Sequence, residues 1–217
     1  MATPDPRARS MSALKARILQ PSLTSHYEVF MQAPTTVRSY IKDQLGLEVN
    51  GNNMEDRVTV PCSEASLPGA RLATHELKDD FTGITQKHAH RRLYDDSANF
   101  TFYVDAKEYY IIRFIEGWLS YISLENVTKD VFRDDYNHRM AFPSDYYASV
   151  LKITKFERDY NTQSGKLVYE FRDAFPIGVS AMPMSYDSSQ LMKCTVEFQF
   201  SRYTINDKNR RIGTILV

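Results

Sequence analysis

One short run of the sequence has residue types and spacing that could bind a metal ion, the basic and histidine-rich segment 87–92. Two histidines at positions i and i+2 of a β-strand lie on the same face, which would let His88 and His90 ligate one ion together. No cysteine or acidic pair stands nearby at the spacing of a third ligand, and the surrounding cations would repel a divalent ion. We therefore expect a polar strand that faces solvent or a neighbouring subunit, and keep metal binding and contact with a polyanion as alternatives.

The sequence has two cysteines, Cys62 and Cys194, and a cysteine nucleophile would need an activating histidine beside one of them. Both occur in alternating apolar segments, where a free thiol packs as a small hydrophobic group. The Asp-Asp pairs at 79–80, 95–96 and 134–135 are typical of solvated turns. The motifs G-x-x-x-x-G-K-[ST], G-x-G-x-x-G and G-x-S-x-G are absent from the sequence. We expect a protein without a catalytic residue, a metal site or a cofactor.

The charge balance of the chain disfavours a general nucleic-acid binder, because 27 Lys and Arg residues are matched by 27 Asp and Glu residues. Basic residues gather only at the two ends, which leaves a DNA-binding module as an alternative. These residues are Arg7, Arg9, Lys15, Arg17, Lys208, Arg210 and Arg211. No apolar run approaches the roughly 20 residues that span a bilayer, so we expect no membrane partner.

The clearest strand pattern of the chain is an alternation of apolar and polar residues with period two in the segment 194–203. Cys194, Val196, Phe198 and Phe200 point one way, and the polar residues between them point the other way. This pattern predicts a strand with one buried and one wet face that closes a β-sheet.

Other segments predict a mixture of strands and helices. Strands are expected at 27–31, 57–62, 100–104, 147–156 and 166–171, with a hairpin loop at 158–165. The segment 111–122 is predicted to be the one long helix, because its apolar residues recur with the helical period. A shorter helical insertion at 34–45 should end at Gly46, and Pro176 should break a sheet ladder. The predicted fold class is α+β, mainly antiparallel β, with one packed α-helix.

The expected organisation is one β domain with an arm before it and a tail after it. The parts are an arm at 1–20, a domain at 21–206 with an insertion at 34–53 and an exposed hairpin or loop at 70–94, and a tail at 207–217. The arm contains a short predicted helix with the apolar stripe Met11, Leu14 and Ile18. An isolated helix of this length is marginal in water, so its stripe needs a docking surface, such as a neighbouring subunit.

Four short blocks follow one another in a characteristic order over roughly residues 57–205. They are 62–69 (Cys-Ser-Glu-Ala-Ser-Leu-Pro-Gly), 92–94 (Arg-Leu-Tyr) leading into 100–102 (Phe-Thr-Phe), 114–118 (Phe-Ile-Glu-Gly-Trp), and 175–203. Together they resemble the tail tube and tube-initiator proteins of large contractile-tailed bacteriophages. The resemblance implies a tail-tube-like β-sandwich or barrel that joins its neighbours into a ring.

The same resemblance implies a structural virion protein of the phage tail or baseplate, assembled in the host cytoplasm and without catalysis. Hexameric rings would share one inner barrel and stack into a conduit for double-stranded DNA. Closing such a ring pairs sheet edges that would otherwise invite aggregation. Expected partners are further copies of the chain and other tail tube, sheath or baseplate proteins.

The resemblance gives the exposed segment 70–94 the role of a ring-stacking element. The residues expected at this interface are Leu67, Pro68, Gly69, Phe81, His88, His90, Arg91 and Arg92. The residues expected in the core are Phe102, Phe114, Trp118, Val196, Phe198 and Phe200. The wet positions Thr195, Glu197 and Gln199 are expected to line the conduit, where a balanced charge would not retard DNA.

Two other classes of protein remain open. An inner-tube protein of a bacterial contractile secretion or tailocin device would share the architecture but carry a different cargo. A metal-binding enzyme that uses His88 and His90 is the lower alternative.

Overall fold

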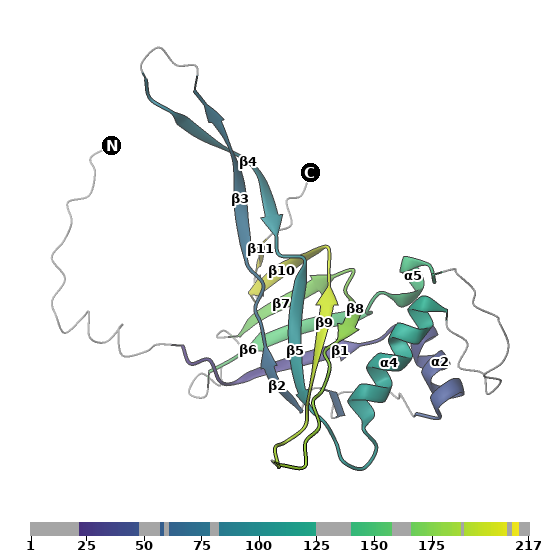
Figure 1. The fold of residues 1–217 in the computed structure, drawn as a ribbon. Helices are drawn as coiled ribbons and strands as arrows, with labels where there is room; N and C mark the ends of the chain where they lie inside the picture. The colour runs from purple at the N-terminus through teal and green to yellow at the C-terminus, as the bar shows by residue number, and fades with distance from the viewer. Residues whose placement is uncertain are drawn as a thin grey trace.

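The computed structural model of the chain shows two antiparallel β-sheets, helices gathered at one side, and a long β-hairpin that projects from one end (Figure 1). The described residues are 22–47, 57–58, 61–78, 83–124, 140–157, 166–187, 189–207 and 210–212. This mainly antiparallel β architecture with a few helices confirms the predicted fold class.

The first sheet has five strands in the order β1-β6-β7-β10-β11, and neighbouring strands run antiparallel. Its strands are β1 (Tyr27–Gln32), β6 (Val150–Lys155), β7 (Leu167–Arg172), β10 (Arg202–Asp207) and β11 (Arg210–Ile212). Val29 pairs with Ile153, and Phe171 pairs with Tyr203, with all four side chains buried. The residues between them turn the other way, so the sheet has one core face and one outward face.

The second sheet has four strands in the order β2-β5-β9-β8. They are β2 (Cys62–Ala65), β5 (Ser97–Tyr103), β9 (Lys193–Gln199) and β8 (Phe175–Val179). Phe100 pairs with Val196 and Phe102 with Cys194, and none of these four side chains is exposed. The buried and wet alternation predicted for β9 is therefore confirmed.

Two longer helices and one short helix cover the buried face of the second sheet at one side (Figure 1). They are α2 (Thr35–Leu45), α4 (Tyr110–Ser123) and α5 (Pro143–Tyr146). α4 is the predicted long helix, and α2 is the helical insertion predicted at 34–45, which ends at Gly46 as expected. Because α2 packs against α4, the core has two packed helices and not the one that we expected. Among the described residues, no helix has the length and apolar content needed to cross a membrane.

The contact between α4 and α2 requires a glycine. A Cβ atom on Gly117 would lie 2.8 Å from Cδ1 of Leu45 and 3.0 Å from Cγ1 of Ile41, closer than ordinary packing allows. At the next residue, Nε1 of Trp118 donates a hydrogen bond of 3.0 Å to the carbonyl of Tyr146 in α5. This bond satisfies the indole inside the core and ties the helices together.

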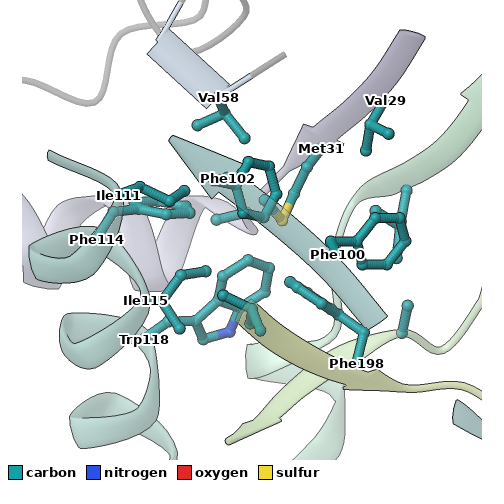
Figure 2. Packing of buried hydrophobic residues seen from close by; sticks show 14 of the residues in the cluster. Val29, Met31, Val58, Phe100, Phe102, Ile111, Phe114, Ile115, Trp118 and Phe198 are labelled. Atoms are coloured by element: carbon teal, nitrogen blue, oxygen red, sulfur yellow. The ribbon is translucent and has the colours of Figure 1, made fainter. Parts of the chain in front are cut away.

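Aromatic rings join the helices to the second sheet in one continuous core (Figure 2). The ring of Phe198 lies 5.6 Å from that of Phe100 and 6.1 Å from that of Trp118, both in edge-to-face geometry. Trp118 in turn lies 5.7 Å from Phe114. All six residues expected in the core are buried, namely Phe102, Phe114, Trp118, Val196, Phe198 and Phe200.

Four details differ from the sequence-based predictions. The strand expected at 57–62 begins only at Cys62, because Arg57 and Val58 lie in a helical turn. Pro176 lies inside β8, where an edge position and a bulge between Pro176 and Gly178 accommodate its missing N–H. The strand expected to continue to Tyr203 ends at Gln199, and the chain crosses to the first sheet as β10. The expected tail contains the short strand β11.

Some predictions fall outside the described residues. They concern the arm helix with Met11, Leu14 and Ile18, the interface residue Phe81, the loop at 158–165, the Asp-Asp pairs at 79–80 and 134–135, and part of the insertion at 34–53.

Candidate assembly surfaces

The segment 70–94 contains a β-hairpin that projects from the body of the molecule (Figure 1). Its strands are β3 (Ala70–Leu77) and β4 (Gln86–Tyr94), paired antiparallel as a separate two-stranded sheet. A bulge opposite Ala73 and Thr74 leaves His90 without a register partner. Most of the hairpin side chains are exposed, as expected for a two-stranded element that is stabilised by packing against a partner.

Two contacts hold the base of the hairpin. The backbone N–H of Gly69 donates to Oδ2 of Asp95 at 2.6 Å, and the N–H of Asp95 donates to the carbonyl of Gly69 at 3.1 Å. The guanidinium of Arg92 lies 4.7 Å from the ring centroid of Tyr94 and 5.8 Å from that of Tyr203 in β10. The first contact closes the base of the hairpin, and the second connects the hairpin to β10 of the first sheet.

Five of the residues that the sequence analysis expects at the interface lie near this base, and their surroundings in the structure differ. Pro68 is buried beside the base, Leu67 and Gly69 are exposed, and Arg91 points from β4 into solvent. Arg92 is exposed as well, but it stacks on two tyrosines. Sequence reasoning did not assign a role to Asp95, although it directly follows the segment 70–94, and it did not find Tyr203, because nothing in the spacing of Tyr203 indicates that it lies beside the hairpin.

The hairpin carries an excess of positive charge. Its one acid among the described residues, Glu76, pairs with Lys87 at 3.1 Å and with Lys78 at 3.5 Å. Arg71 and Arg91 have no acidic partner within the described part of the chain. The register places both arginines on the same face, since Arg71 pairs with Leu93 and Arg91 with Ala73.

The histidines of the hairpin do not form a metal site in the described structure. His88 pairs in register with His75, and its Nε2 lies 3.3 Å from Oε1 of Gln86. His90 occupies the bulge. Over the described residues, no group of three or more His, Cys, Asp or Glu side chains is placed to hold an ion. The histidine pair predicted from the sequence therefore has no third ligand there.

The surroundings of the two thiols make them unreactive. Burial raises the pKa of Cys62 to about 12, and the Sγ of Cys62 bonds to the carbonyl of Glu64 at 3.4 Å. Burial also raises the pKa of Cys194, whose side chain lies in the core. A thiol with such a pKa is protonated at neutral pH and is a poor nucleophile.

A cleft of about 380 Å³ lies beside the start of α4. Arg57 forms an ion pair with Glu108, and its guanidinium lies 5.1 Å from the ring centroid of Tyr110. Burial raises the pKa of Tyr110, whose hydroxyl is enclosed and has no hydrogen-bond partner among the described residues. The residues that line this cleft include no thiol, histidine or serine nucleophile.

The second sheet presents a polar outward face. Thr101 and Thr195 pair across β5 and β9, and their hydroxyls lie 3.1 Å apart. Glu197 and Gln199 continue this face along β9. The only lysine of β9, Lys193, is paired with Glu64 of β2 at 3.2 Å. The face is therefore hydrophilic and carries no excess of positive charge among its described residues.

The connection between β8 and β9 carries an exposed apolar surface that the sequence analysis missed. Met184 and Leu191 are 82% and 78% exposed. With Tyr103, Met182 and Met192 they line a groove of about 800 Å³, which we call the apolar groove. The only sequence signal for it is the run Ala-Met-Pro-Met at 181–184, where apolar residues stand beside a proline outside any strand.

Comparison with known proteins gives one family and several similar structures. The model of the phage tail tube protein family matches residues 22–206. No curated protein matches the sequence. Three similar solved structures come from contractile injection machines, and at 10 to 14% identity they show a shared fold.

A chain of the anti-feeding prophage baseplate has a TM-score of 0.53 at 10% identity, covering 88% of this chain and 99% of that chain. A chain of the cap that terminates the anti-feeding prophage tube has a TM-score of 0.52 at 14% identity, covering 87% and 92%. A chain of the sheath and tube terminator of the PVC extracellular contractile injection system has a TM-score of 0.52 at 11% identity, covering 86% and 97%. The family match spans most of the sequence and agrees with this fold, so the chain belongs to the phage tail tube protein family.

Proposed function

We propose that the chain is a structural subunit of a phage tail tube, or of the initiator ring that joins the tube to the baseplate, and that it has no catalytic activity. Six copies close a ring, and stacked rings form a conduit through which double-stranded DNA passes. Family membership supports the tube role. The anti-feeding prophage baseplate, which contains a chain of this fold, was reconstructed with 6-fold symmetry, and this supports the ring number.

The observation that carries the proposal is the polar outward face of the second sheet. Its opposite face is a dry aromatic core, so the outward face is free to line a water-filled channel. Thr195, Glu197 and Gln199 present hydroxyl, carboxylate and amide groups there. Each phosphate neutralised by a protein cation adds salt-dependent affinity, and a face without free cations lets DNA slide past.

The other surfaces have roles in assembly under this proposal. The β3–β4 hairpin, with Leu67, His88, His90, Arg91 and Arg92, contacts the next ring. The arm at 1–20 docks on a neighbouring subunit, and sheath or baseplate proteins bind outside the ring. The particle is built in the host cytoplasm and becomes part of the virion. A contact around a ring must close, whereas a stacking contact can repeat without limit, so the two kinds of contact need different surfaces.

Mass photometry of the purified full-length chain over a range of concentrations tests the ring. The proposal predicts a particle with the mass of six copies and multiples of that mass. A species that keeps the mass of one chain at every concentration contradicts it. A matched control is the same measurement at raised salt, which weakens exposed charge contacts but leaves apolar ones.

A second candidate is the inner tube of a contractile injection device that carries a cargo other than a genome. The three similar structures from such devices motivate it. Immunogold labelling of contractile particles from producing cells separates the two candidates. Labelled particles whose heads hold nuclease-protected DNA support the phage tail, and labelled headless particles support the injection device.

A further inference from the structure

We propose that the apolar groove receives the apolar stripe of the N-terminal arm, Met11, Leu14 and Ile18, from the neighbouring copy of the chain in the same ring. The inference rests on the proposed ring and deepens it, because it names the surface on which the arm docks. The contact joins copies around one ring and is separate from the contacts that stack one ring on the next.

The side chains of the apolar groove suit the apolar face of a helix. The groove is lined by three methionines, Met182, Met184 and Met192, together with Leu191. Methionine is flexible and polarizable, so a surface rich in this residue adapts to the apolar side chains of an amphipathic helix. Met184 and Leu191 are almost fully exposed within the described chain, and exposed apolar groups that gather at one place mark a contact site.

The arm supplies a face of matching kind. Its apolar residues recur at i, i+3 and i+7, so on a helix they form one stripe that is roughly 10 Å long. A helix of this length is marginal in water and needs a docking surface. Docking of the stripe in the groove removes both apolar surfaces from water, which is favourable.

The described chain begins close to the edge of the second sheet that carries β2. The hydroxyl of Tyr27, at the start of β1, donates a hydrogen bond of 3.4 Å to the carbonyl of Cys62, the first residue of β2. The hydroxyl of Ser22 donates to Oε1 of Glu157 at 2.5 Å, which fixes the point where the arm leaves the body. The chain from Ser22 back to Ile18 spans at most about 14 Å, so the stripe starts within reach of this edge.

The ring brings this edge to the groove of the next copy. The strand registers place the end of β8, the start of β9 and the start of β2 at one end of the second sheet (Figure 1). In one copy β8 and β2 are the opposite edges of this sheet, three strand spacings or roughly 14 Å apart. In the proposed ring the β2 edge of one copy meets the β8 edge of the next. The arm then leaves the body beside the β8–β9 connection of its neighbour.

Charge favours the same pairing. The arm contains four basic residues and one acid, and Lys15 and Arg17 flank its stripe. Among the described residues that line the groove, only Lys193 is charged, and it is paired with Glu64 at 3.2 Å. Asp187 in the β8–β9 connection forms no ion pair within the described structure. A basic arm therefore meets no unpaired cation in the groove and gains attraction from a carboxylate beside it.

Cross-linking between differently tagged copies tests the contact. The full-length variants Leu14→Cys and Leu191→Cys carry different tags and are mixed under assembly conditions before mild oxidation. The inference predicts a disulfide-linked species with both tags. The native thiols add little background, since burial raises the pKa of both Cys62 and Cys194.

Two matched controls should give no species with both tags. In the first, Ala13→Cys replaces Leu14→Cys, because the helical period places Ala13 on the face away from the stripe. In the second, Phe142→Cys replaces Leu191→Cys, at an equally open apolar residue that lies before α5. Equal cross-linking in either control would contradict the contact.

The groove of the same copy is the competing receiver of the arm. The double variant Leu14→Cys with Leu191→Cys, diluted until it is monomeric, tests it. The inference predicts no internal disulfide there. An internal disulfide in the monomer, with no species that carries both tags in the mixture, would show that the arm folds onto its own copy and that the inference is wrong.

The stability of the ring gives a second readout, measured by mass photometry at falling concentration. Leu14→Ala and Leu191→Ala should each raise the concentration at which rings half-dissociate by about tenfold or more, because each removes apolar burial from the contact. The two substitutions together should have little more effect than either alone, since both remove the same contact. Phe142→Ala should leave the concentration unchanged.

These outcomes separate the failure of the contact from the failure of the tube proposal. If the wild-type chain forms six-copy rings but the mixture gives no species with both tags, or if the effects of Leu14→Ala and Leu191→Ala simply add, the groove does not receive the arm of the neighbour and the tube proposal stands. If the wild-type chain forms no such ring, both proposals fail.

Discussion

Gly69 and Asp95 exchange two hydrogen bonds across the base of the β3–β4 hairpin, one of 2.6 Å to the carboxylate and one of 3.1 Å between backbone groups. They stand 26 residues apart in the sequence, at the two points where the chain enters and leaves the hairpin. A Cβ atom on Gly69 would lie 2.9 Å from the carboxylate oxygen, so a larger residue there would push the Asp95 side chain aside. We interpret the pair as the clamp that fixes the hairpin to the body.

The first prediction concerns this clamp. Asp95→Ala removes a charge-assisted hydrogen bond, which contributes about 1.5–3 kcal/mol where it is well shielded and less at this exposed site. Amide hydrogen exchange of β3 and β4 should become faster, while exchange in the core strands β5 and β9 stays slow. Asp96→Ala is the control, because within the described part of the chain Asp96 is bonded only through its backbone carbonyl. Unchanged exchange in the hairpin of the Asp95→Ala variant would show that the clamp does not hold it.

A second prediction concerns the core. Phe198→Ala should lower the free energy of unfolding by about 3–5 kcal/mol, because it leaves a cavity between Phe100 and Trp118. Urea denaturation followed by tryptophan fluorescence measures the loss. Gln199→Ala, at the exposed neighbouring position, should change stability by less than about 0.5 kcal/mol. An equal effect of the two substitutions would contradict the core assignment.

A third prediction concerns acid stability. The side-chain bonds from Lys155 at 2.7 Å and from Ser22 at 2.5 Å lower the pKa of Glu157 from 4.5 to about 2. A lowered pKa means that the folded protein favours the carboxylate. The stabilisation is therefore complete above pH 4.5 and is lost as the pH falls towards 2. Glu157→Gln should melt below wild type at pH 6, and the difference should shrink between pH 4.5 and 2. A difference that stays constant over this range would refute the role of Glu157.

A fourth prediction concerns the thiols. Both cysteines should react slowly with a thiol reagent at pH 8 in the native protein and rapidly in denaturant, because burial raises the pKa of Cys62 to about 12 and also raises that of Cys194. The reaction is followed by absorbance of the released chromophore. Fast labelling of either thiol under native conditions would contradict this prediction and would show a thiol that is accessible and reactive in the folded protein.

A fifth prediction concerns the proposed lining of the conduit by β9. The double variant Glu197→Lys and Gln199→Lys should bind duplex DNA with a steeper salt dependence than wild type, by about 0.9 in the logarithmic slope per added phosphate contact. The matched control is Glu170→Lys with Thr204→Lys, which pair on the outward face of the first sheet. Filter binding of assembled particles at several salt concentrations measures the slopes. Equal slopes for the two double variants would argue against a lining role for β9.

Much of the fold follows from local patterns. The alternation around Val196 and Phe198 predicts β9, and the helical period around Phe114 and Trp118 predicts α4. These patterns are readable because one face of each element meets a single dry core. The exposed hairpin or loop was predicted because the segment 70–94 has no repeating apolar face. A segment of that length without such a face is unusual between strands.

Features that depend on neighbours in space could not be predicted in this way. Pro176 disfavours a strand by its own chemistry, and only its position at a sheet edge with a bulge makes it acceptable. The sequence marks the crossing of the chain after Gln199 only by a break in the alternation, where Arg202 takes the next apolar position and Tyr203 falls out of phase, and this break does not indicate which sheet the chain joins. Local patterns did not predict the apolar groove either, because the exposure of Met184 and Leu191 is a property of the tertiary structure.

Cryo-electron microscopy of particles assembled from the full-length chain tests the central claim most directly. The account predicts rings of six copies in which Thr195, Glu197 and Gln199 face a central channel, and in which the hairpin of one ring reaches the next. A map in which this face of the second sheet points outward, or a sample that contains only separate chains, would contradict it.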